Sequence, residues 1–534
     1  MSDGQVNTDN EQQGSADEAS IGRRGWLKTL ISIPVLGVFI LNFLKKKAED
    51  DMRKREILAE LGVSEEGGPA VIPEAVSRPP GDRIRLGIIG YGGEGAALVR
   101  EAGFAYPGWV DSVRQANREN PRNKALETYL GQADLNVELT AVCDVFDVRA
   151  QQAIDASRVT ERPSGAPQQQ APARRYQRYT ELLEADDVDA VMIATPDHWH
   201  SQMVVDAAAA GKHVYCEKAM TRTEAEAHAV YDAVKASDIV FQLGHQNRQS
   251  ESHMKAQEII AADILGPITL VETTTNRNDK WGAWVWDIHE EGSPQTIDWE
   301  QFEGPAPNKV PFSLERFFRW RCWYDYGTGL SGDLLSHEYD GVNQILGAGI
   351  PHSAVASGGI YYFKDGRDVP DVFQAVYEYP DRDLTFVYSS TLANARYRGM
   401  VFMGHDASMQ VGGSLTVTAD PGSTRFKQKI EDNIIQPSMP MFTYRPGFKG
   451  IDAVTSATEE YFASRGLLYT YRGGRRVSAY HLHIGEWLDV IRNGGEVSCN
   501  VERGFEEAIT CHMATRSYQE GRKVTWDPVR RRIV

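Results

Sequence analysis

The chain has 534 residues, which is too long for one compact core and predicts two or three domains. Its hydrophobic share of 41% and charged share of 25% are typical of a folded globular protein. The formal net charge of -17 argues against a nucleic-acid partner, because phosphate binding needs clustered Lys and Arg. The five cysteines are scattered without C-x-x-C spacing, so neither a disulfide framework nor a zinc site is indicated.

The N-terminal part is expected to lie outside the fold. Residues 1–20 are polar and acidic and predict a disordered leader. Arg23 and Arg24 resemble a twin-arginine export signal, and residues 29–44 form an apolar stretch followed by three lysines. We predict an uncleaved signal and membrane anchor over residues 21–48, with the folded part on the periplasmic side. Because basic residues flank the stretch on both sides, the cytoplasmic face of the membrane is the alternative.

The next segment, residues 49–81, is first charged and then rich in Gly and Pro. This composition predicts a tether with at most one short helix, near Met52–Leu61. The folded part is therefore expected to begin at Asp82.

The folded part opens on a pattern typical of a dinucleotide site. Residues 83–89 predict a buried strand, and Gly90-x-Gly92-x-x-Gly95 follows it directly and leads into a helical pattern. Gly90 permits a tight turn, Gly92 lets the backbone approach a pyrophosphate, and Gly95 allows close packing of helix on strand. The helix N-terminus then supplies unpaired N–H donors to the phosphates.

Asp144 is the second piece of this site, because it ends the strand-like run 137–143. An acid in this place binds ribose hydroxyls and would face a 2′-phosphate, so the sequence predicts NAD over NADP. The distance from Gly95 is about twice the ~20 residues of the simple fingerprint. Residues 105–136 fill it and predict an extra helical insertion. Asp147 competes for the role but falls past the strand end.

Helix-like and strand-like segments then alternate up to residue 245. Strand patterns at 188–194, 213–218 and 239–246 are separated by helical ones, which predicts βαβ units and a parallel, doubly wound α/β sheet of the Rossmann type over residues 82–245. Ligands of such sheets bind at the carboxyl ends of the strands. Four residues stand at these ends: Thr195, Pro196, Glu217 and Lys218.

Beyond this point, short alternating strands dominate. They predict an α+β C-terminal domain over residues 246–534 with a large open, mostly antiparallel sheet. Aromatic residues and arginines crowd two segments of this domain, 276–286 and 317–326. Since sugars need flat apolar surfaces and multidentate donors, three residues there are candidate substrate contacts: Trp281, Arg321 and Tyr324.

The chain resembles the Gfo/Idh/MocA family of sugar and polyol oxidoreductases, and within it the exported branch with twin-arginine signals. The resemblance rests on LLEADDVDAVMIATPDHWHSQMVVDAAAAGKHVYCEKAM, IDWEQFEGPAP, WRCWYDYGTGLSGDLLSHEYDGVNQILG and EWLDVIRNGG, and it covers essentially residues 82–534. It implies that the open sheet of the second domain forms a substrate wall and a homo-oligomer interface.

The resemblance also implies roles for individual residues. Lys218 falls on the family's catalytic lysine, which would bind the substrate hydroxyl and help to move its proton, while Glu217 would contact the nicotinamide ribose. Ala219 replaces the family's proline after this lysine. The expected cofactor residues are Gly90, Gly92, Gly93, Gly95, Asp144, Thr195, Pro196, His198, His200, Glu217 and Gln246. We assign His198 and His200 to the nicotinamide rim rather than to a metal.

Asp333 and His337 match the family's second catalytic pair. Their i, i+4 spacing puts both side chains on one helical face. A histidine suits the proton acceptor in alcohol oxidation, and Asp333 would orient it or bind a substrate hydroxyl. Asp340, three residues on, is a further candidate for substrate binding in the same pocket.

These features predict an NAD-dependent oxidoreductase that acts on a sugar or polyol by hydride transfer. An exported enzyme meets no pool of soluble NAD, so the cofactor is expected not to dissociate. One alternative is an NAD-dependent glycoside hydrolase that works by transient sugar oxidation and elimination. The second is a non-catalytic sugar or nucleotide sensor, whose signature would be loss of Lys218 or His337; both are present.

Overall fold

A computed structural model describes residues 34–62, 81–446, 469–472 and 475–534. The chain divides into two compact units, residues 1–60 and 61–534, and each is considered by itself. The predicted leader over residues 1–20 and the twin-arginine-like pair lie outside the described residues.

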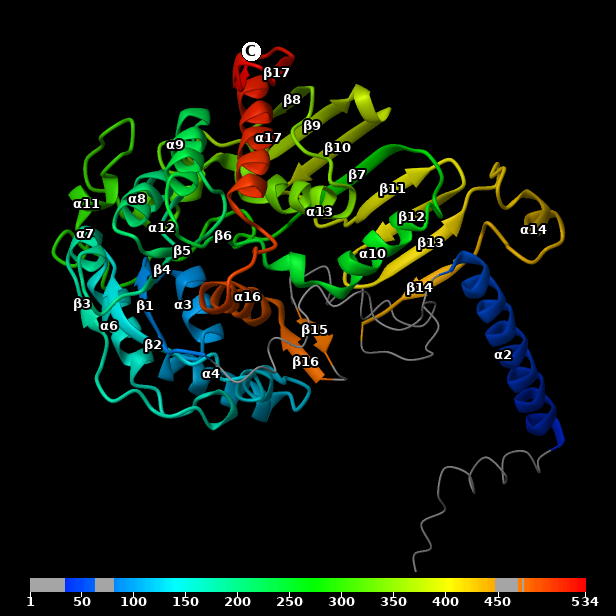
Figure 1. Cartoon of the computed structure of the whole chain (residues 1–534), viewed down its shortest axis with the longest axis horizontal. Helices are drawn as coiled ribbons and strands as arrows, with labels where there is room; N and C mark the ends of the chain where they lie inside the picture. Colours follow the sequence, from blue (N-terminus) through cyan, green and yellow to red (C-terminus); the bar gives the residue numbers. More distant parts are fainter. Residues whose placement is uncertain (1–33, 63–80, 447–468, 473–474) are drawn as a thin grey trace, which may run out of the picture. The chain divides into compact units, whose positions relative to one another are not determined.

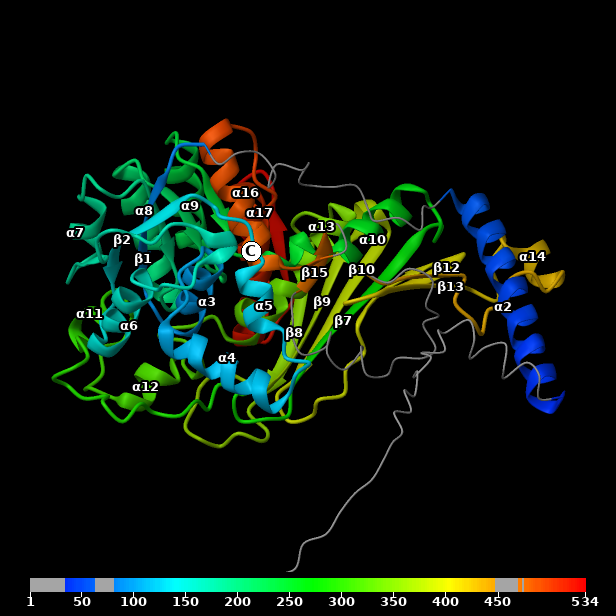
Figure 2. The same cartoon turned by 90° about the horizontal axis from the view of Figure 1, so that it is seen from below.

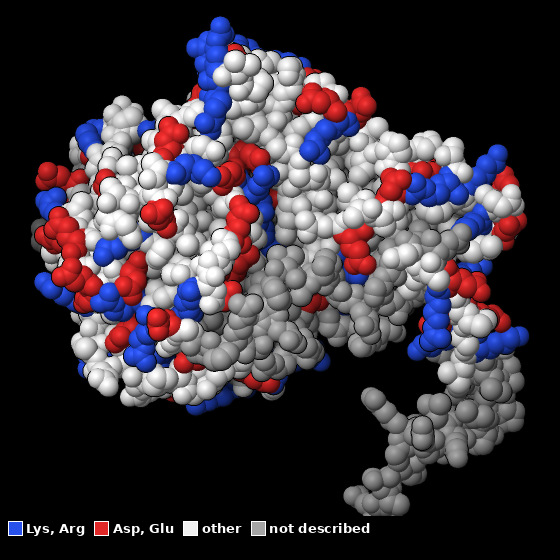
Figure 3. All heavy atoms as spheres, viewed as in Figure 1, with Lys and Arg blue, Asp and Glu red and all other residues white. Residues whose placement is uncertain are grey.

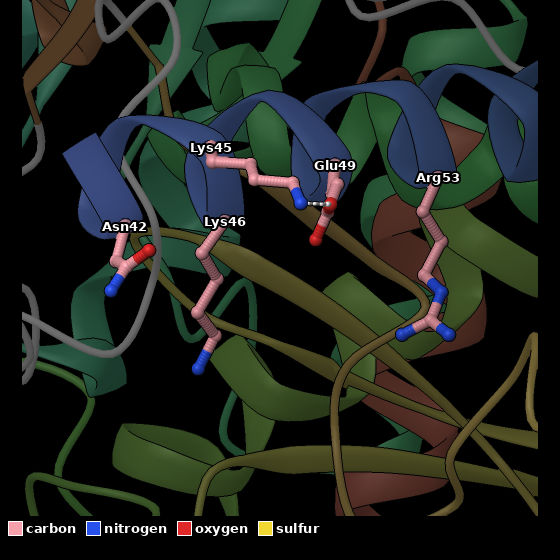
Figure 4. A pocket seen from close by; sticks show the side chains of 5 residues that line it. All are labelled: Asn42, Lys45, Lys46, Glu49 and Arg53. Carbon is pink, nitrogen blue, oxygen red and sulfur yellow. Dashed lines mark ion pairs between the residues drawn. The ribbon is translucent and has the colours of Figure 1, made fainter.

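The first unit contains all of helix α2, Pro34–Leu61, except its last residue, and the helix runs without a break from the apolar stretch into the charged segment. The expected short helix near Met52–Leu61 is therefore wrong in its extent, because the charged residues continue a helix that begins at Pro34. Lys45 and Glu49, one helical turn apart, form an exposed ion pair of 3.9 Å on this helix (Figure 4). In the part of the chain that the structure describes, no helix has the length and apolarity that a bilayer crossing requires.

The N-terminal half of the second unit is built on six parallel strands in the order β3-β2-β1-β4-β5-β6 (Figure 1). The strands are β1 Ile84–Ile89, β2 Val137–Cys143, β3 Arg174–Arg175, β4 Ala190–Ile193, β5 His213–Cys216 and β6 Phe241–Leu243. This order confirms the predicted doubly wound sheet, with its reversal point between β1 and β4. The central strands are buried on both faces, which explains their continuous apolar runs.

Helices connect these strands as the alternating pattern predicts. They are α3 Gly93–Glu101, α4 Pro107–Glu119, α5 Ala125–Leu130, α6 Asp147–Ser157, α7 Tyr179–Leu183, α8 Asp197–Ala209 and α9 Glu224–Lys235. The insertion between β1 and β2 forms α4 and α5, as expected. Local sequence fixes the start of α9, where the Thr223 side chain accepts from the Glu226 N–H and the Glu226 side chain accepts from the Thr223 N–H.

The C-terminal half carries a ten-stranded sheet in the order β14-β13-β12-β11-β7-β10-β9-β8-β17-β18. Its strands are β7 Ile268–Asn276, β8 Ser353–Gly359, β9 Val372–Tyr379, β10 Leu384–Thr391, β11 Met400–Gly404, β12 Ala407–Val411, β13 Leu415–Ala419, β14 Phe442–Tyr444, β17 Val524–Asp527 and β18 Arg532–Ile533. Only the β7–β10 pair is parallel among these described pairs. The expected open, mostly antiparallel sheet is thus confirmed.

Helices cover one face of this sheet (Figures 1 and 2). They include α10 Glu251–Ala261, α13 Ser336–Leu346 and α17 Val501–Glu520, with the π-helical turn η5 Ser331–Leu335 leading into α13. Strand β10 alternates buried and partly exposed residues, as a sheet covered on one side requires. Shorter elements complete this half: η3 Gln246–Gln249, α11 Trp299–Glu303, α12 Leu314–Phe318, η4 Trp320–Cys322, α14 Lys427–Glu431 and the pair β15 Tyr469–Arg472 and β16 Arg475–Ser478.

Helix α16, Ala479–Asn493, returns from the C-terminal half to the parallel sheet. Ile484, Trp487 and Leu488 are buried in the same apolar core as β1 and α3. A single boundary after residue 245 therefore separates the two sheets but does not separate all the residues that pack on them. On the face visible in Figure 3, acidic and basic side chains are interspersed over the described surface.

Candidate functional site

A cavity of about 590 Å³ lies where the carboxyl ends of the parallel strands meet the C-terminal half. Its walls come from the glycine loop, the ends of β2, β4 and β5, the segment before α11, the α11–η4 region and η5–α13. The residues lining it include Gly90, Gly92, Gly93, Glu94, Asp144, Arg149, Thr195, Pro196, Glu217, Lys218, Gln246, Arg277, Trp281, Trp284, Trp286, Phe317, Phe318, Trp320, Arg321, Asp333, His337 and Tyr480. Predicted cofactor and catalytic residues thus share one space.

The glycine loop has the geometry that a dinucleotide requires. Gly90 has φ +87° and donates its N–H to the Cys143 carbonyl over 2.8 Å, which ties β1 to β2. A Cβ on Gly95 would lie 2.1 Å from the Gly90 carbonyl oxygen, so Gly95 serves helix packing and does not line the cavity. Around Gly93 no atom lies within 4 Å of such a Cβ. The backbone there faces open space at the N-terminus of α3, as phosphate binding needs.

Asp144 is 7% exposed and stands at the cavity edge of β2. Its carboxylate accepts the Tyr91 N–H over 2.6 Å and the Phe146 N–H over 2.8 Å, so the glycine loop and the start of α6 hold it in place. Burial raises its pKa, whereas the Arg149 guanidinium and the two N–H groups oppose this rise. Each oxygen keeps a lone pair for a ribose hydroxyl.

Glu217 and Gln246 form a buried hydrogen-bonded pair at the end of β5. The Gln246 side-chain amide donates to Glu217 Oε1 over 2.8 Å and to the Tyr215 hydroxyl over 3.0 Å. Burial is the main cause that raises the pKa of Glu217 well above its ordinary value, and nearby Glu94 adds to it. Both residues line the cavity.

Lys218 and Asp333 meet across the two halves of the fold. Lys218 Nζ donates to Asp333 Oδ1 over 2.7 Å and to the Asp333 carbonyl over 3.0 Å, and both side chains are about one-tenth exposed. Arg321 Nε lies 2.9 Å from Asp333 Oδ2. Although burial opposes it, the cations Arg321 and Lys218 hold the pKa of Asp333 far below its ordinary value. The peptide bond between Lys218 and Ala219 is cis.

His337 lies one helical turn beyond Asp333 and lines the same cavity. Its ring packs edge-to-face on His245 with centroids 5.5 Å apart. Burial is the first cause that lowers its pKa well below 6.5, and Lys218 and His245 lower it further. The imidazole is therefore neutral near pH 7 and able to accept a proton.

Two histidines predicted at the nicotinamide rim do not line the cavity. His198 Nε2 lies 2.8 Å from the Phe302 carbonyl oxygen of α11. The ring nitrogens of His200 lie 2.7 Å from the Ala219 carbonyl oxygen and 2.8 Å from the Thr195 carbonyl oxygen. The assignment to the rim is corrected: both rings turn inward because main-chain carbonyls, which the sequence does not reveal, surround the first turn of α8.

Two substrate candidates are also placed elsewhere. Asp340 is 2% exposed and is held by Arg248, whose Nε and Nη2 lie 2.8 and 2.6 Å from Asp340 Oδ1. It does not line the cavity, because its carboxylate is engaged by the Arg248 guanidinium of η3. Tyr324 is absent from the lining, and its backbone N–H donates to Asp368 over 2.8 Å.

Several tryptophans contribute to the wall of the cavity. Trp281 is 53% exposed, while Trp284, Trp286 and Trp320 also face the cavity. The Arg321 guanidinium carbon lies 4.1 Å from the Trp320 ring centroid and 5.2 Å from that of Trp286. This end of the cavity combines flat apolar surface with fixed donors.

Several lining residues escaped the sequence analysis, among them Glu94, Arg149, Arg277 and Tyr480. Arg149 follows Asp144 at the first turn of α6, so its short distance from the strand end is a signal that could have found it. Tyr480 offers no such signal, because α16 reaches the parallel sheet only through tertiary packing.

Residues 296–318, here named the cover segment, fasten the C-terminal half over the rim of the parallel sheet. The Asp147 N–H donates to the Thr296 carbonyl over 3.0 Å, and the Asp298 N–H donates to the Val145 carbonyl over 2.9 Å. Trp199 Nε1 donates to the Phe302 carbonyl over 3.0 Å. The cover segment therefore closes the cavity beside Asp144.

Two family models match the chain. One, described as the oxidoreductase family with an NAD-binding Rossmann fold, covers residues 84–245, and the other, its C-terminal alpha/beta domain, covers residues 257–526. The NAD-binding character of the Rossmann domain follows from the first match.

Individual relatives align with parts of the chain. Levoglucosan dehydrogenase of Pseudarthrobacter phenanthrenivorans is 29% identical over 188 residues, which are 33% of this chain and 40% of that protein. D-xylose 1-dehydrogenase (NADP+) of Hypocrea jecorina is 35% identical over 112 residues, 21% of this chain and 29% of that protein. The chain thus spans less than half the length of these curated relatives.

A solved structure extends the likeness in fold. Levoglucosan dehydrogenase in complex with NADH has a TM-score of 0.54 at 18% identity, over 83% of this chain and 99% of that chain. At this identity the likeness concerns the fold alone.

Proposed function

Because the chain belongs to the Gfo/Idh/MocA oxidoreductase family, we propose that it oxidises a hydroxyl group of a sugar or polyol with NAD as hydride acceptor. The observation that carries this proposal is the meeting of Lys218, Asp333 and His337 in the cavity that the glycine loop also lines. The relatives named for levoglucosan and D-xylose support the substrate class.

The residues of the glycine loop fit a dinucleotide. Gly92 and Gly93 leave room along the N-terminus of α3 for the pyrophosphate, and Asp144 would hold a ribose through its hydroxyls. Glu217 and Gln246 would line the nicotinamide half. When bound, NAD supplies the acceptor for a hydride.

The chain's own residues would handle the proton. Lys218 Nζ would donate to the reacting hydroxyl oxygen and stabilise negative charge that develops there. A ring nitrogen of His337 that carries no proton in the neutral imidazole would take the hydroxyl proton. Asp333, anchored by Arg321, would hold the Lys218 ammonium toward the substrate.

The tryptophan wall would bind the sugar ring. Trp281 and Trp286 offer flat faces, and Arg321 and Arg277 offer donors for several hydroxyls. This arrangement supports a ring-shaped or polyhydroxylated substrate over a small acyclic alcohol.

Tight retention of NAD and a periplasmic location belong to the same proposal. The twin-arginine-like residues and the apolar stretch 29–44 support export in the folded state. Retention follows because an exported enzyme cannot exchange its cofactor with a cytoplasmic pool. Protease accessibility in spheroplasts tests the location: digestion only after lysis would assign the protein to the cytoplasmic face.

The open face of the ten-stranded sheet is the proposed homo-oligomer interface.

The central experiment identifies the nucleotide that accompanies the purified full-length protein. After extensive desalting and denaturation, mass spectrometry should find NAD in a near-stoichiometric amount. The protein is then incubated with a panel of sugars and polyols while absorbance near 340 nm reports reduced nicotinamide. Binding of NAD without reduction by any polyol would contradict the dehydrogenase proposal, and release of a glycoside aglycone without net reduction would identify the hydrolase.

A further inference from the structure

The side chain of Arg149 lies beside the glycine loop in an aromatic enclosure. A Cβ on Gly92 would come 3.8 Å from Arg149 Nη1. The guanidinium carbon lies 5.7 Å from the ring centroid of Phe146, 5.3 Å from that of Phe317 and 5.4 Å from that of Phe318. Since Phe317 and Phe318 end the cover segment, the guanidinium is held between the two halves of the fold.

The hydrogen-bonding capacity of this guanidinium is unused. Within the described residues, no hydrogen bond or ion pair to a protein group satisfies Arg149, although it has five N–H donors. The other arginines nearby are paired: Arg321 with Asp333, and Arg319 with Glu315 and the Trp286 carbonyl. Burial lowers the pKa of Arg149, as expected for a cation without a close acceptor.

The position of Arg149 indicates which class of acceptor its N–H donors suit. Gly92 marks the place of a pyrophosphate and Asp144 that of the neighbouring ribose. Asp144 attracts the guanidinium electrostatically, but no contact within 4.0 Å joins the two side chains among the described ion pairs. An anionic group between the glycine loop and Asp144 would satisfy Arg149, and a phosphate suits the planar fork of its donors.

We propose that Arg149 binds a phosphate group of the dinucleotide and that Phe317 and Phe318 make its retention depend on the cover segment. This inference rests on the proposed dinucleotide-dependent function. The phosphate is either the pyrophosphate or a 2′-phosphate on the ribose, and the two sources can be told apart by the nucleotide supplied.

The cover segment and the start of α6 form one supported unit. The two backbone hydrogen bonds that join residues 145–147 to residues 296–298 lie at the start of α6, the helix that carries Arg149 in its first turn. Phe317 also packs on Phe146, with ring centroids 6.0 Å apart. The rings therefore fix the guanidinium before the ligand arrives, which lowers the entropic cost of binding.

The first test measures the affinity of full-length Arg149→Gln and Arg149→Lys for NAD+, NADP+, ADP-ribose and adenosine by calorimetry, after nucleotide removal. We expect Arg149→Gln to weaken the affinity for ADP-ribose and NAD+ by about tenfold to a hundredfold, because a charge-assisted hydrogen bond to phosphate is lost. The affinity for adenosine, which has no phosphate, should change by no more than about twofold. The Arg149→Lys protein, which keeps the positive charge, should lose less affinity for these two nucleotides than the Arg149→Gln protein. Equal losses for NAD+ and NADP+ identify the pyrophosphate, and a larger loss for NADP+ identifies a 2′-phosphate.

A matched control is Arg319→Gln, since Arg319 is paired within the protein and does not line the cavity. Wild-type affinity of a folded Arg149→Gln protein for all four nucleotides overturns the inference while leaving the proposed function intact. If the wild type itself binds neither NAD+ nor NADP+, both the proposed function and the inference fail.

The second test addresses the cover segment. The release of NADH, followed by its fluorescence, should be about fivefold or more faster in a Phe317→Leu, Phe318→Leu protein, because ring support of the guanidinium is lost. Phe312→Leu serves as control, since that ring packs on Trp299. A release rate equal to that of the wild type in the Phe317→Leu, Phe318→Leu protein overturns the dependence on the cover segment, and equally fast release from the Phe312→Leu protein overturns the role of the rings around Arg149.

Discussion

The two ends of the cavity are built on different principles. The cofactor end consists mainly of backbone: the loop from Gly90 to Gly95, the ends of neighbouring strands and the carboxylate of Asp144, which two N–H groups hold. The end proposed to bind the substrate consists of long side chains, and Lys218 and Asp333 come from positions 115 residues apart. One end depends on short-range turn geometry and the other on the packing of two halves.

The two ends of the cavity therefore tolerate different substitutions. A binding site made of backbone is disrupted when a side chain is added at a closely packed glycine, because the added Cβ clashes with main-chain atoms that cannot move away. A side-chain constellation fails when one charge is removed, because its partners are left buried and unpaired.

Lys218→Met should have the largest effect, lowering kcat/KM for the identified polyol by about a thousandfold, because the donor to the developing alkoxide is lost. Affinity for NAD+ should change by no more than about threefold, since the cofactor end stays intact. Steady-state kinetics and calorimetry measure the two quantities. Lys235→Met, at an exposed ion pair with Glu502, is the control. Turnover at the wild-type rate would remove Lys218 from the mechanism.

Gly95→Ala should abolish tight nucleotide binding and destabilise the fold by about 3 kcal/mol, because its Cβ would lie 2.1 Å from the Gly90 carbonyl oxygen. Gly93→Ala should keep the melting temperature of the wild type, since no atom lies within 4 Å of its Cβ. Differential scanning calorimetry compares the two variants. Equal melting temperatures would contradict the packing role of Gly95.

Trp281→Ala should raise KM about fivefold and change kcat by less than about twofold, because the ring contributes uniform binding at the edge of the cavity. The ring is 53% exposed, so folding should be unaffected. Tyr362→Ala, 67% exposed and outside the cavity lining, is the matched control. An unchanged KM would show that the Trp281 ring does not contribute to substrate binding.

His198→Gln should have the smallest effect, confined to the pH dependence of stability. Burial lowers the pKa of His198 to about 3, so below its ordinary 6.5 the unfolded chain takes up a proton that the folded chain does not. The stabilisation is complete above pH 6.5 and is lost as the pH falls toward 3. Each such site changes the free energy of unfolding by up to about 1.4 kcal/mol per pH unit. Between pH 7 and 5.5, the free energy of unfolding should therefore fall by about 1 kcal/mol less in the His198→Gln variant than in the wild type.

Denaturant unfolding at these two pH values measures the difference. His352→Gln replaces an exposed histidine and serves as control. An equal fall in the free energy of unfolding in His198→Gln and the wild type would show that His198 does not contribute to the loss of stability in acid.

Sequence reasoning succeeded where local geometry governs. Gly90, Gly92 and Asp144 follow strands whose apolar runs are continuous, and a strand end must lie at the sheet rim whatever surrounds it. It failed for His198, His200 and Asp340, because their partners are carbonyl groups or an arginine that only folding brings near. The long α2 was missed since charged residues favour helix as readily as a tether.

The two kinds of sheet, the glycine loop and the two segments that carry Lys218, Asp333 and His337 can all be predicted from the sequence alone. Periodicity and turn chemistry act over a few residues, so they can be read along the chain. The tertiary structure decided that the cover segment closes the cavity, that α16 returns to the parallel sheet, and that Arg149 faces the glycine loop between rings from both halves. These features depend on contacts between segments far apart in the chain, where packing selects the partner.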